Sequence, residues 1–267
     1  MQEKHHPLVS VVMPVYNGAK VVAQAIDSVL IQSVDCEVII IDDASPEDLM
    51  PVLKPYLERP DIRYYRNQKN LGVAGSRNRG VRMARGEYVA FLDCDDWWEP
   101  DKLSKQLERM DQTGTVLCCT GRRFVTFEGE KTDQIVPVKE ILTYRDLLWH
   151  NAINCSSVLM KKDVAAAFPM EHDECHEDYL TWLKILKQYG KASAVNEPLL
   201  CYRLSGGKSK SGNKLKSAKM TYQVYRLMGF GTLKSLLCFA AYAFHGVSKY
   251  YLSELPPLIE VGASIGR

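Results

Sequence analysis

Several common signals are missing from this 267-residue sequence. The opening residues, MQEKHHPLVS, contain no apolar stretch, so they predict no secretion signal. The eight cysteines include no CxxC pair and no repeated spacing, which favours reduced thiols in a cytoplasmic protein over a disulfide framework. The late apolar run at residues 235–247 is shorter than the roughly 20 residues that a helix needs to span a bilayer.

The usual phosphate-binding and zinc-binding motifs are also absent. No GxGxxG follows the first predicted strand, and the chain has no GxxxxGK[ST], so neither a dinucleotide-binding turn nor a P-loop is predicted. His172, Cys175 and His176 lie close together but have no second Cys/His pair nearby, so a zinc site is not predicted either. Any nucleotide must be held in another way.

Composition places the chain among ordinary globular proteins, but its charge is uneven. Apolar residues make up 46% and charged residues 25%, which is enough apolar material for a sizeable core. Residues 206–267 contain nine Lys/Arg and two acidic residues, whereas residues 1–205 contain 25 basic and 30 acidic residues. Such asymmetry predicts that the basic part meets an anionic surface.

The first hundred residues predict repeated strand–helix units of an α/β fold with a largely parallel sheet. We expect strands at 9–15, 37–41, 62–65 and 88–92, and helices at 19–31, 46–58, 75–84 and 101–110. The later part is less regular, with strands expected at 116–119, 122–127, 156–160 and 199–202, helices at 142–150 and 177–189, and two helices beyond 215 with a break at 229–232.

Polar clusters follow three of these strands. PVYNG ends the first strand, DDAS ends the second, and DCDD follows the strand 88–92. Because the carboxyl ends of neighbouring parallel strands lie at one edge of a sheet, we expect the three clusters to share a crevice. An Asp-x-Asp pair, here Asp93 and Asp95, suits a hard divalent cation that also binds phosphate oxygens and water.

Each cluster also has a structural interpretation. DDAS is typical of an Asx turn that caps a helix at Ser45. DCDD can form a solvated acidic turn in which Asp96 caps the next helix. Glu177 and Asp178 open an amphipathic helix, where the helix dipole favours carboxylates whatever their function. The residues alone leave these alternatives open.

The order of four blocks is more specific than any one motif. VSVVMPVYNGAKVVAQAIDSVLIQSVDCEVIIIDDAS is followed by NLGVAGSRNRGVRMARGEYVAFLDCDDWWEPDKL, then by HEDYLTWLKIL and LLCYRLSGGKSKS. Over residues 7–210 the chain resembles glycosyltransferases of family 2, which have the GT-A fold, a mixed Rossmann-like α/β sheet flanked by helices. The expected organisation is a catalytic domain at 1–205, a flexible loop at 206–214, and a basic, apolar helical extension at 215–267.

The resemblance implies a role for particular residues. Asp178 matches the catalytic base, and Asp95 and Asp93 match the ligands of Mg²⁺ or Mn²⁺. Glu177 and Trp182 fall on the acceptor side. The positions that match the nucleotide-sugar donor site are Pro14, Tyr16, Asn17, Asp43, Arg77, Asp93 and Arg203. Two departures are Ser205, where the family often has histidine and a phosphate contact is therefore in question, and Ser76, where alanine is usual.

The expected reaction is inverting transfer of a hexose from a nucleotide diphosphate sugar, such as a UDP-sugar, to a hydroxyl of a glycan or polyprenyl-linked acceptor. The metal would neutralise charge on the leaving diphosphate while Asp178 takes the acceptor proton. The alternatives are a non-catalytic sugar-nucleotide-binding or scaffold protein on the same fold and a sugar nucleotidyltransferase. A phosphatase with an aspartate nucleophile is disfavoured because its Asp-x-Asp would follow the first strand.

The C-terminal extension has two interpretations. Lysines at 208–219 followed by apolar helices suit an anionic membrane surface, which would place the enzyme at the inner face of the cell membrane. Alternatively, these helices pack on the domain or on a second subunit. Nucleic-acid binding is not expected, because no aromatic residues are interleaved with the lysines at 208–219.

Overall fold

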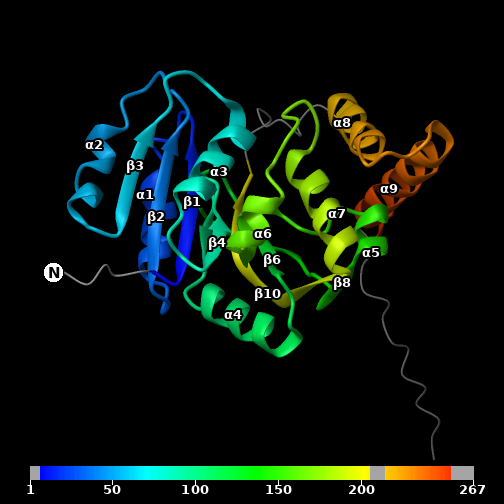
Figure 1. Cartoon of the computed structure of the whole chain (residues 1–267), viewed down its shortest axis with the longest axis horizontal. Coiled ribbons are helices and arrows are strands. Elements are labelled where there is room, and N and C mark those ends of the chain that lie inside the picture. The colour runs from blue at the N-terminus through cyan, green and yellow to red at the C-terminus, as the bar shows by residue number, and fades with distance from the viewer. Residues whose placement is uncertain (1–6, 205–213, 254–267) are drawn as a thin grey trace, which may run out of the picture.

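The computed structural model describes residues 7–204 and 214–253, which form one mixed β-sheet with helices on both faces (Figure 1). The strand order is β3-β2-β1-β4-β9-β6-β10-β5, with β7 added beside β6 and β8 beside β10. The predicted mixed α/β sheet flanked by helices is therefore confirmed.

The N-terminal half of the sheet is parallel. It contains β1 (Val9–Val15), β2 (Cys36–Asp42), β3 (Ile62–Arg66) and β4 (Tyr88–Phe91). Every residue of β1 is buried, as expected for a central strand covered on both faces. Alternate side chains of β1 point to opposite faces of the sheet. Val12 packs in the hydrophobic cluster on one face, whereas Val11 and Met13 pack in the cluster on the other.

The C-terminal half of the sheet is mixed. It contains β5 (Trp97–Trp98), β6 (Leu117–Val125), β7 (Lys131–Val136), β8 (Ile141–Thr143), β9 (Leu159–Lys161) and β10 (Lys191–Arg203). Strand β9 is antiparallel to both β4 and β6, and so joins the two halves. Strand β10 runs parallel to β6, with a register shift between Val195 and Leu200, beside Pro198.

Helices divide between the two faces (Figure 1). One face is covered by α1 (Val22–Leu30), α2 (Met50–Leu53) and α4 (Lys102–Thr113). The other is covered by α3 (Gly72–Met83), α5 (Tyr144–Trp149), α6 (Lys162–Ala167) and α7 (Glu177–Tyr189), joined by α8 (Lys214–Leu227) and α9 (Thr232–Ser253). Short 3₁₀ turns lie at Tyr56–Glu58 and Cys155–Ser157.

Some predicted elements differ in extent. The helix expected at 46–58 is reduced to α2 and a 3₁₀ turn, because Ala44 has a positive φ of 58° and Pro55 has no amide hydrogen to donate. The two strands expected at 116–127 are one strand, β6, and the strand expected at 199–202 is the end of the 13-residue β10. Strands β7 and β8 and helix α6 were not predicted.

The C-terminal helices pack against the domain. The break expected at 229–232 is observed, since α8 ends at Leu227 and α9 begins at Thr232. Val224, Tyr225 and Cys238 are buried in the same core cluster as α5 and α7. The predicted loop at 206–214 lies outside the described residues except for Lys214. In the described part of the chain, no helix is long and apolar enough to cross a membrane.

Candidate active site

The three polar clusters lie at one edge of the sheet. Strand β1 pairs in parallel with both β2 and β4, so their carboxyl ends lie side by side. The Asp43 amide donates to the Val15 carbonyl at 2.8 Å, and the Leu92 amide donates to the Val12 carbonyl at 3.1 Å. A Cβ at Gly18 would lie 2.8 Å from Cys94 Sγ, which shows how closely the PVYNG turn packs on DCDD.

The first cluster is partly open to solvent. Pro14 is buried in β1, whereas the Tyr16 side chain is 52% exposed at the end of that strand. Asn17 has a positive φ of 56°, and its amide donates to Ser45 Oγ at 3.2 Å. The structure thus leaves the Tyr16 ring available at the sheet edge and buries Pro14 beneath it.

The two aspartates of DDAS have different surroundings. Asp42 Oδ1 accepts from the Ser45 amide at 2.8 Å, which is the Asx turn expected from the sequence, although no helix begins at Ser45. Asp42 Oδ2 accepts from Tyr64 and Arg66, each at 2.7 Å. Asp42 is therefore committed to the turn and to β3.

Asp43 is instead fixed by the segment that leads into α3. Its Oδ1 accepts from Asn67 Nδ2 and from the Leu71 amide, each at 2.7 Å. Asn67 also donates to Ser76 Oγ at 2.9 Å, so the small hydroxyl at the family's alanine position takes part in this network. These contacts hold the Asp43 carboxylate in one orientation at the sheet edge.

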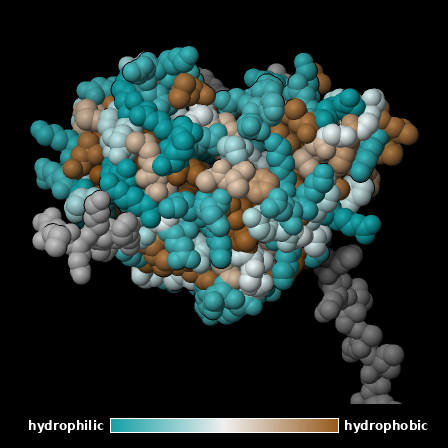
Figure 2. All heavy atoms as spheres, in the orientation of Figure 1, coloured by the Kyte–Doolittle hydropathy of each residue, from teal (hydrophilic) through white to brown (hydrophobic). Residues whose placement is uncertain are grey.

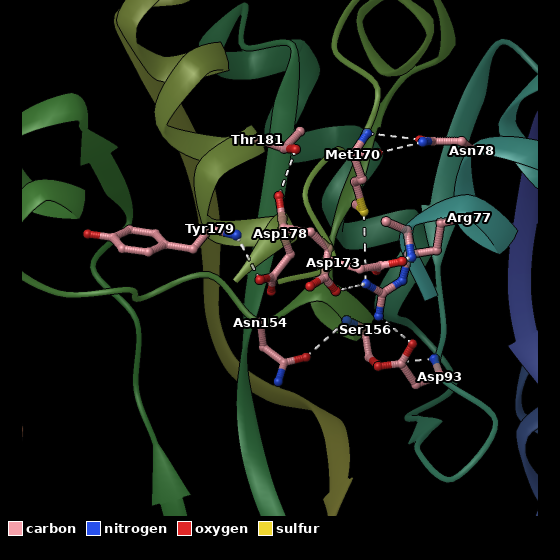
Figure 3. Close-up of polar contacts among 12 residues, drawn as sticks. Arg77, Asn78, Asp93, Asn154, Ser156, Met170, Asp173, Asp178, Tyr179 and Thr181 are labelled. Atoms are coloured by element: carbon pink, nitrogen blue, oxygen red, sulfur yellow. Dashed lines mark hydrogen bonds and ion pairs between the residues drawn. The ribbon is translucent and has the colours of Figure 1, made fainter. Parts of the chain in front are cut away.

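Arg77 is the central cation of the site. Its side chain is 4% exposed, and its guanidinium bonds Asp93 Oδ1 at 2.6 Å and Glu177 Oε1 at 3.1 Å (Figure 3). Burial alone would lower the Arg77 pKa, but the negative charges of Asp93 and Glu177 outweigh it and raise the pKa well above the ordinary value. The guanidinium thus joins the end of β4 to the start of α7.

This geometry gives two of the predicted site residues partners within the protein. Arg77 was expected to approach the nucleotide phosphates, yet both of its terminal nitrogens bond carboxylates of the protein. Glu177 was expected on the acceptor side, yet it is 7% exposed and paired with Arg77. Because a buried charge needs a partner, the two side chains satisfy each other inside the protein.

Asp95 and Asp96 respond differently to crowding with Asp93. Burial, and then the charge of Asp93, raise the pKa of Asp95 to about 6. Asp96 is 2% exposed, and burial, followed by the charges of Asp95 and Asp93, raises its pKa well above the ordinary value. Asp96 Oδ1 accepts from the Arg203 amide at 3.0 Å. Asp96 therefore links the acidic turn to β10. One interpretation of the sequence had Asp96 capping α4, but the residue at the N-cap of α4 is Asp101.

Arg203, which was predicted as a donor-site residue, also has contacts within the protein. Its guanidinium bonds the Asp95 carbonyl at 2.8 Å, the Phe127 carbonyl at 2.5 Å and Gln24 Oε1 at 2.6 Å. The guanidinium also lies 5.0 Å from the centre of the Trp97 ring. In this arrangement Arg203 fixes the backbone of the acidic turn.

Asp178 lies in the first turn of α7, near Arg77 and Asp93. Its Oδ1 accepts from the Tyr179 amide at 2.7 Å (Figure 3). Burial raises the Asp178 pKa above its ordinary value, and the positive charge of Arg77 opposes part of that increase. A carboxyl group with a raised pKa is a stronger base than an exposed one, which suits proton transfer near neutral pH.

Trp182 does not line this site. It was predicted on the acceptor side, but its side chain is fully buried and its ring lies 6.4 Å from that of Phe91. One helical turn after Asp178, the inward face of α7 meets the core and not the crevice. Trp182 therefore anchors α7 to the hydrophobic core.

Three further residues near the site were not identified from the sequence. Ser156 Oγ accepts from the Asp93 amide at 3.2 Å. Tyr242 of α9 lies near Asp178, whose charge raises the Tyr242 pKa together with the larger effect of burial. Arg122 of β6 is partly buried, and within the described residues its side chain makes cation–π contacts but no hydrogen bond or ion pair. These three residues lie outside any recognised sequence motif, so nothing in the sequence marks them as part of the site.

Comparison with known proteins identifies the family. Residues 10–166 match the model of glycosyl transferase family 2. The chain is 38% identical, over 248 residues, to a putative teichuronic acid biosynthesis glycosyltransferase, TuaG, of Bacillus subtilis, and the match covers 91% of this chain and 97% of that protein. It is 30% identical, over 247 residues, to the UDP-Glc:alpha-D-GlcNAc-diphosphoundecaprenol beta-1,3-glucosyltransferase WfaP of Escherichia coli, covering 92% and 96% of the two chains.

Solved structures confirm the fold. The S. aureus protein TarS, residues 1–349 in complex with UDP-GlcNAc, matches with a TM-score of 0.69 at 16% identity, covering 88% of this chain and 71% of that one. The mannosyltransferase PcManGT of Pyrobaculum calidifontis, in complex with GDP-Man and Mn²⁺, matches with a TM-score of 0.65 at 17% identity, covering 95% and 78%. The chain belongs to glycosyltransferase family 2.

We predict that Arg77→Met destabilises the protein by about 3–5 kcal/mol, because it removes the buried cation that pairs with the buried Glu177 and the partly exposed Asp93. Urea unfolding at pH 7.5 measures this loss. Adding Glu177→Gln to Arg77→Met should recover part of it. The matched control is Arg59→Met, which breaks a solvent-exposed pair with Asp61 and should change the unfolding midpoint little. Equal midpoints for Arg77→Met and Arg59→Met would contradict the proposed role of the buried pairs.

Proposed function

We propose that this protein transfers a hexose from a nucleotide diphosphate sugar to an acceptor hydroxyl, by a single displacement that inverts the anomeric configuration. The observation that carries the proposal is that Asp93, which pairs with Arg77, and Asp178 lie close enough for the charges of Arg77 and Asp93 to act on Asp178. One carboxylate belongs to the Asp-x-Asp turn and the other to a separate helix, so the proposal assigns the leaving group to the first and the base to the second. Membership of family 2 supports this assignment.

The donor is inferred to bind at the carboxyl edge of β1, β2 and β4. The exposed Tyr16 ring offers a stacking surface for a base, and the held Asp43 carboxylate offers an acceptor for a base N–H. Support for a uridine nucleotide comes from relatives, since WfaP uses UDP-Glc and TarS was solved with UDP-GlcNAc. Arg122 lies close enough to Asp96 for that charge to act on it, and we assign it as a further guanidinium that faces substrate phosphate.

A divalent cation, Mg²⁺ or Mn²⁺, fits the Asp-x-Asp turn. Asp93 and Asp95 form a pair of oxygen donors, and burial, followed by the charge of Asp93, disfavours the Asp95 carboxylate unless a cation accompanies it. In the described part of the chain, no group of three or more His, Cys, Asp or Glu side chains could hold a metal. Diphosphate oxygens and water would complete the shell of such an ion, which would supply charge neutralisation for the leaving group. PcManGT was solved with Mn²⁺.

The acceptor is inferred to be a lipid-linked glycan at the inner face of the cell membrane. WfaP and the E. coli enzyme WfgD, which is 32% identical over 222 residues, both act on alpha-D-GlcNAc-diphosphoundecaprenol. Asp178 would accept the proton of the attacking hydroxyl, and its half-buried position keeps bulk water from competing for that role. Glu177 would act indirectly, by holding Arg77 and the first turn of α7.

We predict that Asp178→Asn lowers the transfer rate by about 10²–10⁴-fold, because the amide cannot take the acceptor proton. UDP binding, measured by calorimetry, should remain close to that of the wild type. The matched control is Glu171→Gln, which removes an exposed carboxylate shortly before α7. Wild-type turnover by Asp178→Asn would remove Asp178 from the mechanism.

The same variant has an expected effect on stability. Folding raises the Asp178 pKa from 3.8, so its protonated form is the one that folding favours. The contribution of Asp178 to stability is therefore fully present below pH 3.8 and is lost as the pH rises through the raised pKa. At pH 8 the melting temperature of Asp178→Asn should equal or exceed that of the wild type, since asparagine carries no charge to bury.

We also predict that Mn²⁺ binding weakens as the pH falls through about 6, because protons compete with the metal for Asp95. Well below that pH, each further unit should weaken binding by up to about tenfold. Electron paramagnetic resonance of free Mn²⁺, titrated alone against the protein at pH 7.5 and pH 5, measures the change. Asp95→Asn should abolish this site, whereas Glu108→Gln on the exposed side of α4 should not. Unchanged affinity at pH 5 would contradict the assignment of Asp95 as a ligand.

A further inference from the structure

Helix α9 has two different faces. Ser235 and Cys238 are buried, and Tyr242 packs against the core cluster on the same side. On the opposite side lies an apolar surface, here called the outer face of α9. It consists of Leu233, Leu236, Leu237, Ala240 and Phe244, all of them exposed, with the four larger side chains 73%, 50%, 62% and 73% exposed, respectively.

Helical periodicity places these five side chains together. At 3.6 residues per turn, positions 233, 236, 237, 240 and 244 fall on one side of a helix, and positions 235, 238 and 242 fall on the other. In Figure 2 hydrophobic residues gather at the end of the molecule where α8 and α9 lie. Exposed leucine and phenylalanine side chains aligned along one helix are typical of an interaction surface.

The charge along α8 and α9 has one sign. From Leu204 to Ser253 the sequence contains eight Lys/Arg residues and no Asp or Glu. Lys216, Lys219, Arg226 and Lys234 are exposed on the described parts of α8 and α9. A surface that is both apolar and basic is complementary to an anionic lipid leaflet, in which the apolar side chains reach the acyl region and the cations meet the headgroups.

A second copy of this chain fits the surface less well. In a symmetric dimer the same patch meets itself, so Lys234 beside the outer face of α9 would approach its own copy, and neither α8 nor α9 supplies an acidic residue to offset that repulsion. Spanning the membrane is also disfavoured, since no described helix is long and apolar enough to cross it. The remaining arrangement is a helix that lies in the plane of the membrane surface.

We propose that the outer face of α9 docks on an anionic bilayer and so brings the active site to the membrane. The opposite face of α9, which includes Tyr242, packs close to the residue that follows Asp178. The Tyr242 ring lies 6.0 Å from that of Tyr179, the residue that follows Asp178. Tyr179 also contacts α8, since its hydroxyl lies 3.2 Å from that of Tyr225.

Helix α9 therefore lies between the docking surface and α7. With side chains, a helix is about 10–12 Å across, so docking would bring Asp178 to within about one helix diameter of the lipid surface. A sugar joined to a lipid through a diphosphate is held at a similar height above the bilayer. This step rests on the proposed function, because it supposes that the acceptor is lipid-linked.

Vesicle flotation of the full-length protein tests the docking surface. The variant is Leu233→Ser with Leu237→Ser, and the matched control is Ile31→Ser with Ile135→Ser, whose wild-type side chains are 58% and 46% exposed elsewhere on the molecule. On vesicles of phosphatidylcholine with phosphatidylglycerol, we expect wild type and control to float equally and the α9 variant to bind at least tenfold more weakly. Wild-type binding should fall on phosphatidylcholine alone.

Three results would overturn the proposal. They are equal flotation of the α9 variant and the control, equal binding of wild type to charged and neutral vesicles, and light scattering that shows a wild-type dimer dissociated by the α9 substitutions. The last result would assign the face to a second copy of the chain. Circular dichroism should show unchanged melting, because the substituted side chains are exposed.

Transfer to a soluble acceptor separates this proposal from the proposed function. With N-acetylglucosaminyl diphosphate on a short alkyl chain as acceptor, the α9 variant should keep the wild-type rate within about twofold, since the chemistry does not need the membrane. Loss of transfer by the α9 variant with this acceptor would contradict a role confined to docking. Failure of the wild type itself on this acceptor would count against the proposed acceptor and leave the flotation result standing.

Discussion

The site depends on one buried guanidinium with two carboxylate partners. Arg77 bonds Asp93 at 2.6 Å and Glu177 at 3.1 Å, and these acids come from segments far apart in the sequence. Removing the cation would take away the positive charge shared by the buried Glu177 and the partly exposed Asp93, which is why such a bridge constrains its surroundings strongly. Asp93 leads the Asp-x-Asp turn, and Glu177 precedes Asp178, so the ion pairs fix the spacing between the two halves of the site.

The neighbouring carboxyl groups of Asp93, Asp95 and Asp96 are stabilised in three different ways. Asp93 has the cation Arg77, Asp96 is buried in an environment that favours its protonated form, and Asp95 keeps an intermediate pKa of about 6. The Asp95 carboxyl therefore ionises at a pH not far below neutral. This suits a divalent ion, because the ion's charge would offset both the burial and the repulsion by Asp93 that raise the Asp95 pKa. Arg203 holds the turn through the Asp95 backbone and leaves the Asp95 carboxylate for that role.

The sequence predicted the parallel strands and the meeting of their polar ends, because both follow from local patterning and from the geometry of parallel sheets. It also placed Asp43 and Asp178 on the correct elements. It could not predict where long side chains point, since the direction of Arg77 and Arg203 depends on partners such as Glu177, Gln24 and the Phe127 carbonyl that are distant in sequence. The resemblance to a family transferred the positions of these residues but not their contacts. The short strands β7 and β8 were missed because three to six residues carry little periodicity.

Helix α9 lies between the candidate active site and the proposed membrane-docking surface, since it contacts Tyr179 on one side and has an exposed apolar face on the other. The central claim remains that Asp178 and the Asp-x-Asp turn act from opposite sides of one sugar carbon. The anomeric configuration of the product tests it most directly. Given an α-linked UDP-sugar and a soluble acceptor, proton NMR of the isolated product should show a β-linkage. An α-linkage would contradict single displacement and the role assigned to Asp178.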